Sequence, residues 1–234
     1  MPHIIKIIGT FFALILCSFK TTSATQHDVQ SWFNVTAIGN FNQKDNTDSK
    51  IKFWLEGQER VGDEVSRFTQ TLLRPGIGYS FNTNLSLWVG YAWTYTGLPL
   101  TSTPFAENRI WEQLLWVKSY DSVTLTSRTR IEQRFLQNNP KTAYRARQLF
   151  KVGIPLNHSP KWSLVSSEEV FIHKNNFNGP NSKGFDQNRF FIGIGYEFTP
   201  NLITEIGYMN QYIQRVGIPN FLANIASFNL FLSL

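Results

Sequence analysis

The residues with the clearest chemical potential are arginines and glutamates that recur at alternate positions. In segment 122–136, Arg128, Arg130, Glu132 and Arg134 are each separated by one residue. Successive side chains of a strand point to opposite sides, so this spacing would place the four charges on one face. Guanidinium groups offer several N–H donors to carboxylate or phosphate oxygens, so such a face could pair with internal acids or bind anions. The full set of candidates is Arg74, Arg109, Arg128, Arg130, Glu132, Arg134, Arg145, Arg147, Arg189 and Glu197.

Groups suited to catalysis or metal binding are sparse. The histidines beyond residue 24 are His27, His158 and His173. They lack the spacing of a metal site, and the sequence predicts neither a metal nor a cofactor. A lipase-like hydrolase needs a serine, a histidine and an acid on neighbouring strands, and His173, near Ser167 and Glu169, approaches that set. Glu168 and Glu169 are adjacent, so they would face opposite sides and could not share a proton.

The composition narrows the class of protein that can carry these residues. The chain has 234 residues, of which 42% are hydrophobic, 15% aromatic and 16% charged, whereas soluble domains are about 25% charged. The mean hydropathy is −0.21, and after residue 19 no apolar run approaches the roughly 18 residues of a spanning helix. High aromatic content excludes a disordered chain. The net charge of +6 comes without any run of Lys or Arg, which gives no indication of nucleic-acid binding.

The first 24 residues are typical of a cleaved secretory signal. Lys6 supplies a positive charge, residues 7–19 form a short apolar core, and residues 22–24 are small, as a cleavage site requires. A membrane anchor would need a longer run. Cys17, the only cysteine, has no small residue before it and so does not fit a lipoprotein signal. Disulfides and thiolate chemistry are therefore not expected after cleavage.

Alternation of apolar and polar residues dominates the sequence from residue 29 to the end. In segment 122–136, Val123 and Leu125 share one face, whereas Thr124 and Thr126 share the other with the arginines. A period of two residues is the pattern of a half-buried strand. The alternation predicts strands over 29–41, 50–61, 65–81, 84–97, 107–120, 122–136, 142–155, 161–174, 184–198, 201–215 and 220–234.

The connections between these strands differ in length. Tight turns centre near 82–84, 121, 157–160 and 199–201, whereas longer polar links span 97–106, 137–141 and 175–183. Short turns at one end and longer loops at the other are typical of outer-membrane barrels.

A short glycine-rich motif also recurs. Gly76-Ile77-Gly78-Tyr79 returns as Gly193-Ile194-Gly195-Tyr196, and Gly90-Tyr91 returns as Gly207-Tyr208 at the same offset. A phosphate-binding loop would need a following helix, which the pattern does not predict. We interpret the repeat as two similar hairpins whose glycines relieve crowding.

Three features favour a membrane barrel over a soluble one. The predicted strands are long enough to span a membrane with some overhang. Arginine on a lipid-facing side would cost roughly 2–4 kcal/mol at mid-membrane, so the charged face must point inward. Tyrosine and tryptophan gather near strand ends, as interfacial girdles require: Tyr79, Trp93, Tyr95, Trp116, Tyr120, Tyr144, Trp162, Tyr196, Tyr208 and Tyr212.

The sequence thus predicts an antiparallel up-and-down transmembrane β-barrel of about 10–12 strands, formed as one domain by residues 25–234. Bacterial single-chain barrels have even strand counts. We therefore expect ten or twelve strands, with 29–41 as the least certain segment.

Several motifs together resemble a known bacterial family. They are Arg74-Pro75-Gly76-Ile77-Gly78-Tyr79, Asn84-Leu85-Ser86-Leu87-Trp88-x-Gly90-Tyr91, Glu107-Asn108-Arg109-x-Trp111-x-Gln113, Arg128-x-Arg130-x-Glu132-x-Arg134-Phe135 and Tyr144-Arg145-x-Arg147. In these motifs, spread over nearly all of the chain after residue 24, the sequence resembles the family called domain of unknown function 2490. The resemblance implies a secreted, outer-membrane-type β-barrel. It implies no activity and no catalytic residue.

Two interpretations of the charged face stay open. Arginines could meet Glu56, Glu107, Glu169 and Glu205 in a salt-bridged interior that fills a narrow barrel, or they could line an eyelet that favours small anions. We expect a porin-like channel or structural protein of the bacterial outer membrane, whose partners are outer-membrane lipid and the assembly machinery. The alternatives are a barrel enzyme acting on lipid or peptide and a surface-binding protein that uses loops 97–106 and 175–183.

Overall fold

The computed structural model describes residues 25–41, 50–120, 123–137, 139–156, 159–177 and 183–234. The predicted signal at 1–24 lies outside the described residues. So do the turn residues 121 and 157–158 and part of the link 175–183.

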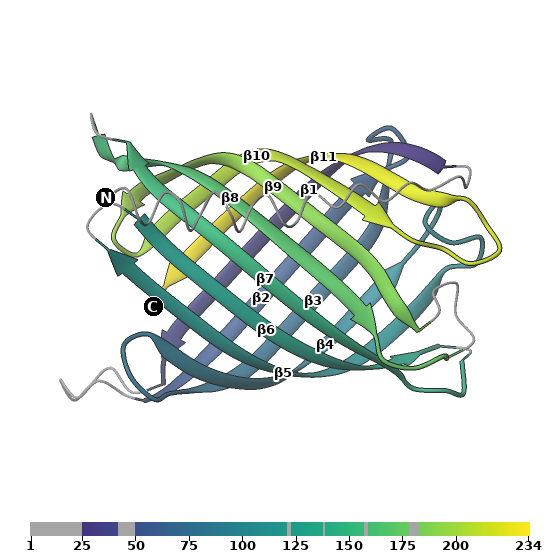
Figure 1. Cartoon of the computed structure of the whole chain (residues 1–234), viewed down its shortest axis with the longest axis horizontal. Helices are drawn as coiled ribbons and strands as arrows, with labels where there is room; N and C mark the ends of the chain where they lie inside the picture. The colour runs from purple at the N-terminus through teal and green to yellow at the C-terminus, as the bar shows by residue number, and fades with distance from the viewer. Residues whose placement is uncertain (1–24, 42–49, 121–122, 138, 157–158, 178–182) are drawn as a thin grey trace.

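All regular structure in the described residues is β-strand, arranged as one closed barrel (Figure 1). The predicted all-β barrel is confirmed, and each strand lies where the alternation placed it, with ends shifted by a few residues. The strands are β1 Thr25–Asn40, β2 Ile51–Gly62, β3 Arg67–Ser80, β4 Leu85–Thr96, β5 Phe105–Tyr120, β6 Val123–Leu136, β7 Ala143–Leu156, β8 Ser159–His173, β9 Gly184–Thr199, β10 Leu202–Ile213 and β11 Asn220–Ser233.

The expectation of an even strand count is wrong, because the barrel has eleven strands. Neighbours along the chain pair antiparallel, but β1 pairs parallel with β11, from Thr25 opposite Asn220 to Ile38 opposite Ser233. β1 also pairs antiparallel with β2. Segment 29–41 is therefore a genuine strand. A parallel ladder satisfies backbone groups with only slightly less stability per residue, so closure needs a paired seam rather than an even count.

The two ends of the barrel differ. At the end we call the turn end, on the left in Figure 1, residues 81–84 and 200–201 make short connections, and the chain ends there at Leu234. At the opposite end, the loop end, the connections 97–104, 137–142, 174–183 and 214–219 are longer. The predicted division into short turns and longer loops is therefore confirmed only in part, because the turn end also has the ten-residue connection 41–50 and the loop end has the short connection 63–66.

One connection at the loop end is tight. Residues Asp63, Glu64 and Val65 all have positive φ, at 55°, 55° and 62°. Their turn is held from β1, because the Asp28 carboxylate accepts backbone N–H groups of Asp63 at 3.2 Å and Glu64 at 3.0 Å. This contact fastens the start of β1 to the β2–β3 turn.

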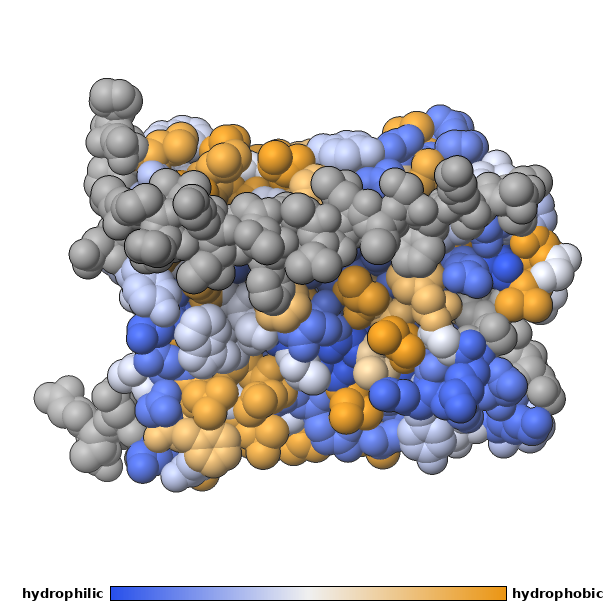
Figure 2. All heavy atoms as spheres, in the orientation of Figure 1, coloured by the Kyte–Doolittle hydropathy of each residue, from blue (hydrophilic) through white to orange (hydrophobic). Residues whose placement is uncertain are grey.

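The outer wall of the barrel is largely apolar. Exposed aliphatic side chains include Val35, Ile77, Val89, Ile192 and Ile206. Exposed aromatic side chains include Tyr79, Tyr120 and Trp162 toward the turn end and Tyr95 and Tyr144 toward the loop end. On the face shown in Figure 2, hydrophobic residues gather over the middle of the wall, whereas hydrophilic residues gather toward the loop end. A helix long and apolar enough to cross a membrane is not found in the described part of the chain.

The glycine repeat lies in two hairpins, β3–β4 and β9–β10. Gly76 pairs with Gly90, and Gly193 pairs with Gly207. A Cβ on Gly76 would lie 2.5 Å from the Trp111 ring, and a Cβ on Gly207 would collide with the Ile192 carbonyl oxygen. These glycines therefore allow a close approach of strands or of a large ring.

We expect Gly207→Ala to lower the free energy of unfolding by about 1–3 kcal/mol, because the added methyl forces apart packed backbone. Urea denaturation of the barrel folded into lipid vesicles measures this quantity. Gly153→Ala is the matched control, since a Cβ there meets nothing within 4 Å. Equal losses in the two variants would contradict the role assigned to the glycine pair.

Candidate functional site

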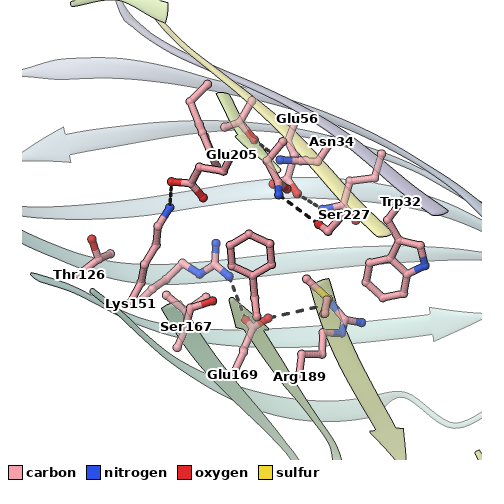
Figure 3. A pocket seen from close by; sticks show the side chains of 18 of the residues that line it. Trp32, Asn34, Glu56, Thr126, Lys151, Ser167, Glu169, Arg189, Glu205 and Ser227 are labelled. Atoms are coloured by element: carbon pink, nitrogen blue, oxygen red, sulfur yellow. Dashed lines mark hydrogen bonds and ion pairs between the residues drawn. The ribbon is translucent and has the colours of Figure 1, made fainter. Parts of the chain in front are cut away.

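The barrel interior holds two cavities in line. The larger, about 330 Å³, lies toward the turn end and is lined by residues such as Val117, Thr126 and Lys151 (Figure 3). The smaller, about 160 Å³, lies toward the loop end and is lined by residues such as Thr96 and Glu107. The residues that line both are Trp32, Gln58, Arg74, Arg147 and Arg189, which we call the belt. The belt separates the two cavities.

Buried ion pairs surround the belt. Glu132 contacts Arg145 at 2.6 Å and Arg147 at 2.8 Å, with Arg74 at 4.0 Å. Its side chain is completely buried. Buried charges of this kind are stable only when paired and hydrogen-bonded.

A second acid near the belt is also shared by several cations. Glu169 contacts Arg147 at 2.8 Å and Arg128 at 2.9 Å, with Arg189 at 4.0 Å. Glu56 bonds to Arg74 at 2.7 Å. Each of these acids therefore neutralises part of a larger group of guanidiniums.

A third group of ion pairs lies beside the smaller cavity, on the loop-end side of the belt. Glu107 contacts Arg109 at 2.6 Å and Arg134 at 2.5 Å. Asp186 contacts Arg145 at 3.1 Å and His173 at 3.3 Å. Beyond the strands, Arg215 also lines the smaller cavity, and burial lowers the pKa of its guanidinium.

Cations outnumber acids in this interior, and some guanidinium N–H groups lack an acceptor. Arg130 bonds to the Gln113 amide oxygen through Nε at 2.9 Å and Nη2 at 2.5 Å, and Arg60 bonds to Gln58 and Gln70. Neither forms an ion pair with a residue in the described ranges. The buried guanidinium N–H groups without an acceptor among the described residues are Arg60 Nε, Arg74 Nε, Arg128 Nε, Arg130 Nη1 and Arg189 Nε.

Arginines and aromatic rings alternate in a stack across the interior. The Arg60 guanidinium lies 3.7 Å from the Trp32 ring, and the Arg189 guanidinium lies 4.9 Å from the Trp32 ring and 4.6 Å from the Phe171 ring. Arg147 completes the stack at 4.5 Å from Phe171. Because these residues come from β2, β1, β9, β8 and β7, the stack links distant walls of the barrel. Cation–π contacts therefore act here beside the ion pairs that Arg147 and Arg189 form with Glu169.

The structure brings most of the predicted site residues together. Arg74, Arg147 and Arg189 belong to the belt, and Arg128 lines the larger cavity. Arg109, Arg134 and Arg145 line the smaller cavity, and Arg130 and Glu132 are fully buried within the wall of charges. Glu197 lies apart near the turn end of β9 and forms no ion pair with a described residue.

Some residues of this interior were not predicted. Trp32 lies in segment 29–41 and is not among the predicted site residues, yet it forms part of the belt. Asp186 gives no signal by alternation, because an irregularity between Phe171 and Ile172 places both Asp186 and Gln187 inside. Gln113 and Phe171 are buried partners of the arginines. The predicted strand faces indicate that these two side chains point inward, but they do not indicate which arginines the side chains contact.

The geometry does not assemble hydrolase chemistry around His173. Its Nε2 lies 3.3 Å from Asp186 and 3.5 Å from Arg134. Ser167 is six residues away on the same strand, which corresponds to about 20 Å. Among the described residues, no cluster of His, Cys, Asp and Glu could hold a metal ion.

Comparisons with known proteins identify a family and a similar fold. A family model described as "Protein of unknown function (DUF2490)" matches residues 29–221. An uncharacterized protein of Methylorubrum extorquens strain AM1 is 30% identical over 231 residues, which cover 97% of this chain and 96% of that protein. A solved structure of the NanC porin matches with a TM-score of 0.50 and 11% identity, over 84% of this chain and 94% of that one. At this identity the porin supports the fold alone.

Proposed function

The chain belongs to the DUF2490 family of proteins of unknown function, and from this premise we propose that it is an outer-membrane barrel with a narrow, anion-preferring passage. The observation that carries the proposal is the belt. Three of its members are arginines, and it lies between the two cavities of the barrel interior. Rings of cationic side chains favour the passage of anions.

Placement in the outer membrane is supported by the outer wall. Exposed aliphatic residues between two zones of exposed Tyr and Trp match the lipid-facing band and girdles of membrane barrels. Short turns are the periplasmic side of such barrels, so the turn end would face the periplasm. Residues 1–24 would direct export, and the apolar alternation Leu230, Leu232 and Leu234 would be read by the outer-membrane assembly machinery.

A structural role is the second candidate. The ion pairs of Glu132, Glu169 and Glu107 fill much of the cross-section, as in narrow barrels whose interiors are occupied by side chains. A barrel closed in this way would stabilise the envelope without conducting ions.

Planar-bilayer recording of the purified protein tests the proposal. In a salt gradient we expect stepwise currents whose reversal potential shows several-fold preference for chloride over potassium, because cations exceed acids along the passage. Replacing the belt arginines Arg74, Arg147 and Arg189 together by Gln should abolish this preference. Arg67→Gln, at an exposed turn position, is the matched control and should keep it.

A shift in gel mobility on boiling verifies that each sample is folded. If well-folded protein carries no current, the passage is excluded and the structural role stands. If the current prefers cations, the proposed role of the arginines is wrong.

A further inference from the structure

We infer that the larger cavity is a binding site for a small organic oxyanion, in which a carboxylate or phosphate group is joined to an apolar body. The inference deepens the proposed function, because it names the class of anion that the interior would hold. It concerns binding, which is measured separately from conductance.

The first argument is the set of unused donors. Arg74, Arg128 and Arg189 all line the larger cavity, and each has a buried Nε–H without an acceptor among the described residues. One terminal nitrogen of each faces an acid: Arg74 Nη1 bonds to Glu56 at 2.7 Å, Arg128 Nη2 bonds to Glu169 at 2.9 Å, and Arg189 Nη1 lies 4.0 Å from Glu169. A buried donor without an acceptor is destabilising. An oxyanion supplies several acceptors at once and would form charge-assisted hydrogen bonds.

The second argument is charge. Glu132, which does not line the cavity, pairs with Arg147 from behind. The cations that line the cavity are Arg74, Arg128, Arg147, Arg189 and Lys151, whereas the acids that line it are Glu56, Glu169 and Glu205. Arg130 lies behind them and interacts electrostatically with Arg74, Arg128 and Arg147. The floor of the cavity therefore carries a surplus of positive charge. A ligand with a negative group would offset that surplus in a site of low dielectric constant.

The third argument is the apolar part of the wall. Beside the arginines, the cavity is lined by Leu115, Val117, Leu149, Met209 and Phe231. These side chains give a hydrated inorganic ion no partner, but they fit a hydrocarbon body. A volume of about 330 Å³ lies at the small end of the range of about 300–1,000 Å³ that ligand sites occupy.

The position of the cavity in the barrel determines from which end a ligand can enter. Lys151 and Glu205 meet in this cavity at 2.5 Å (Figure 3). Lys151 pairs with Thr126, which lies two residues nearer the turn end of β6 than Arg128. The belt lies on the opposite side and separates the cavity from the loop end. A ligand would therefore enter from the turn end, pass this paired charge and place its oxyanion against Arg74, Arg128 and Arg189.

Titration calorimetry on the purified, detergent-solubilised protein tests the inference. The probes are benzoate, phenyl phosphate and the uncharged isostere benzamide. We expect saturable binding of benzoate or phenyl phosphate at one site, with benzamide binding at least about tenfold more weakly. The relative affinities of the two anions identify which oxyanion the site prefers. Acetate, which lacks the ring, should also bind more weakly than benzoate.

Arg128→Gln should weaken anion binding by about tenfold, since one guanidinium is lost while Glu169 keeps Arg147. Arg67→Gln makes the same change at an exposed turn and should leave binding intact. Equal binding of benzamide and benzoate, equal loss in both variants, or no binding to folded protein would overturn the inference. Anion-selective current without benzoate binding would overturn the inference but not the proposed function. Benzoate binding without current would overturn the proposed function but not the inference.

Discussion

Trp32→Ala should raise the single-channel conductance roughly threefold or more, because it removes the largest side chain of the belt. Trp32 lines both cavities, and its ring lies in contact with Arg60 at 3.7 Å and Arg189 at 4.9 Å. Without the indole, the two cavities would join along this side of the interior. Arg189 would also lose one of its two ring partners and gain freedom to move. Single-channel recording at fixed salt measures the change.

Trp162→Ala is the matched control for this prediction. Trp162 is exposed on the outer wall near the turn end, where it packs on Tyr196 with ring centroids 4.5 Å apart. Its loss removes the same atoms from the chain without touching the interior, so the conductance should not change. Trp32→Phe keeps a ring in the belt and should give an intermediate value. An unchanged conductance in folded Trp32→Ala would place the narrowest point elsewhere.

The strands themselves could be predicted because each is half-buried along its whole length. In β4, for example, Leu87, Val89 and Tyr91 face outward while Trp88 and Ala92 are buried inside. Such a wall imposes a period of two residues, which a helix does not share. A soluble barrel would show the same period, so the long strands, the aromatic residues and the arginines were needed to favour a membrane barrel. The inward direction of the arginines followed from the cost of placing a guanidinium in lipid.

The strand count was not predictable from local pattern. Whether β1 pairs with β11 depends on the tilt and shear of the whole barrel, and these link residues almost 200 positions apart, such as Thr25 and Asn220. The alternation within each strand is the same whether β1 and β11 pair in parallel or antiparallel, so it does not reveal whether the strand count is odd or even. Only the rule of even counts was available, and this barrel departs from it.

The ion pairs were also beyond prediction, because they do not follow the direct pairing of strands. Arg134 is opposite Arg109 in the ladder, yet it bonds to Glu107, two residues away on the same face. Arg147 is opposite Phe171 and bonds to Glu169. Diagonal neighbours of this kind are within reach of long side chains. The sequence shows which residues share a face, but the register and tilt decide which of them meet.

Glu132→Gln should lower the free energy of unfolding by about 3–5 kcal/mol, the usual cost of breaking a buried ion pair by removing one partner. The Glu132 carboxylate accepts hydrogen bonds from Arg145 at 2.6 and 2.9 Å and from Arg147 at 2.8 Å. Glutamine has nearly the same shape, so no cavity is made. Its amide removes the negative charge and turns one acceptor into a donor that faces a guanidinium. Urea denaturation of the barrel in lipid vesicles measures the loss.

Glu112→Gln makes the same substitution on the outer wall, where Glu112 accepts hydrogen bonds from Gln133 at 3.0 and 3.1 Å. A charge removed from the lipid-facing side should leave stability unchanged or raise it. A loss in Glu132→Gln no greater than in Glu112→Gln would show that the buried charges do not hold the barrel together. If the predicted difference is found, the buried acids stabilise the fold. Each of these acids is shared among several arginines, so the arginines outnumber the acids and the belt stays positively charged. A more acidic interior would then be more fully paired but less selective for anions, so stability and selectivity would oppose one another at the same residues.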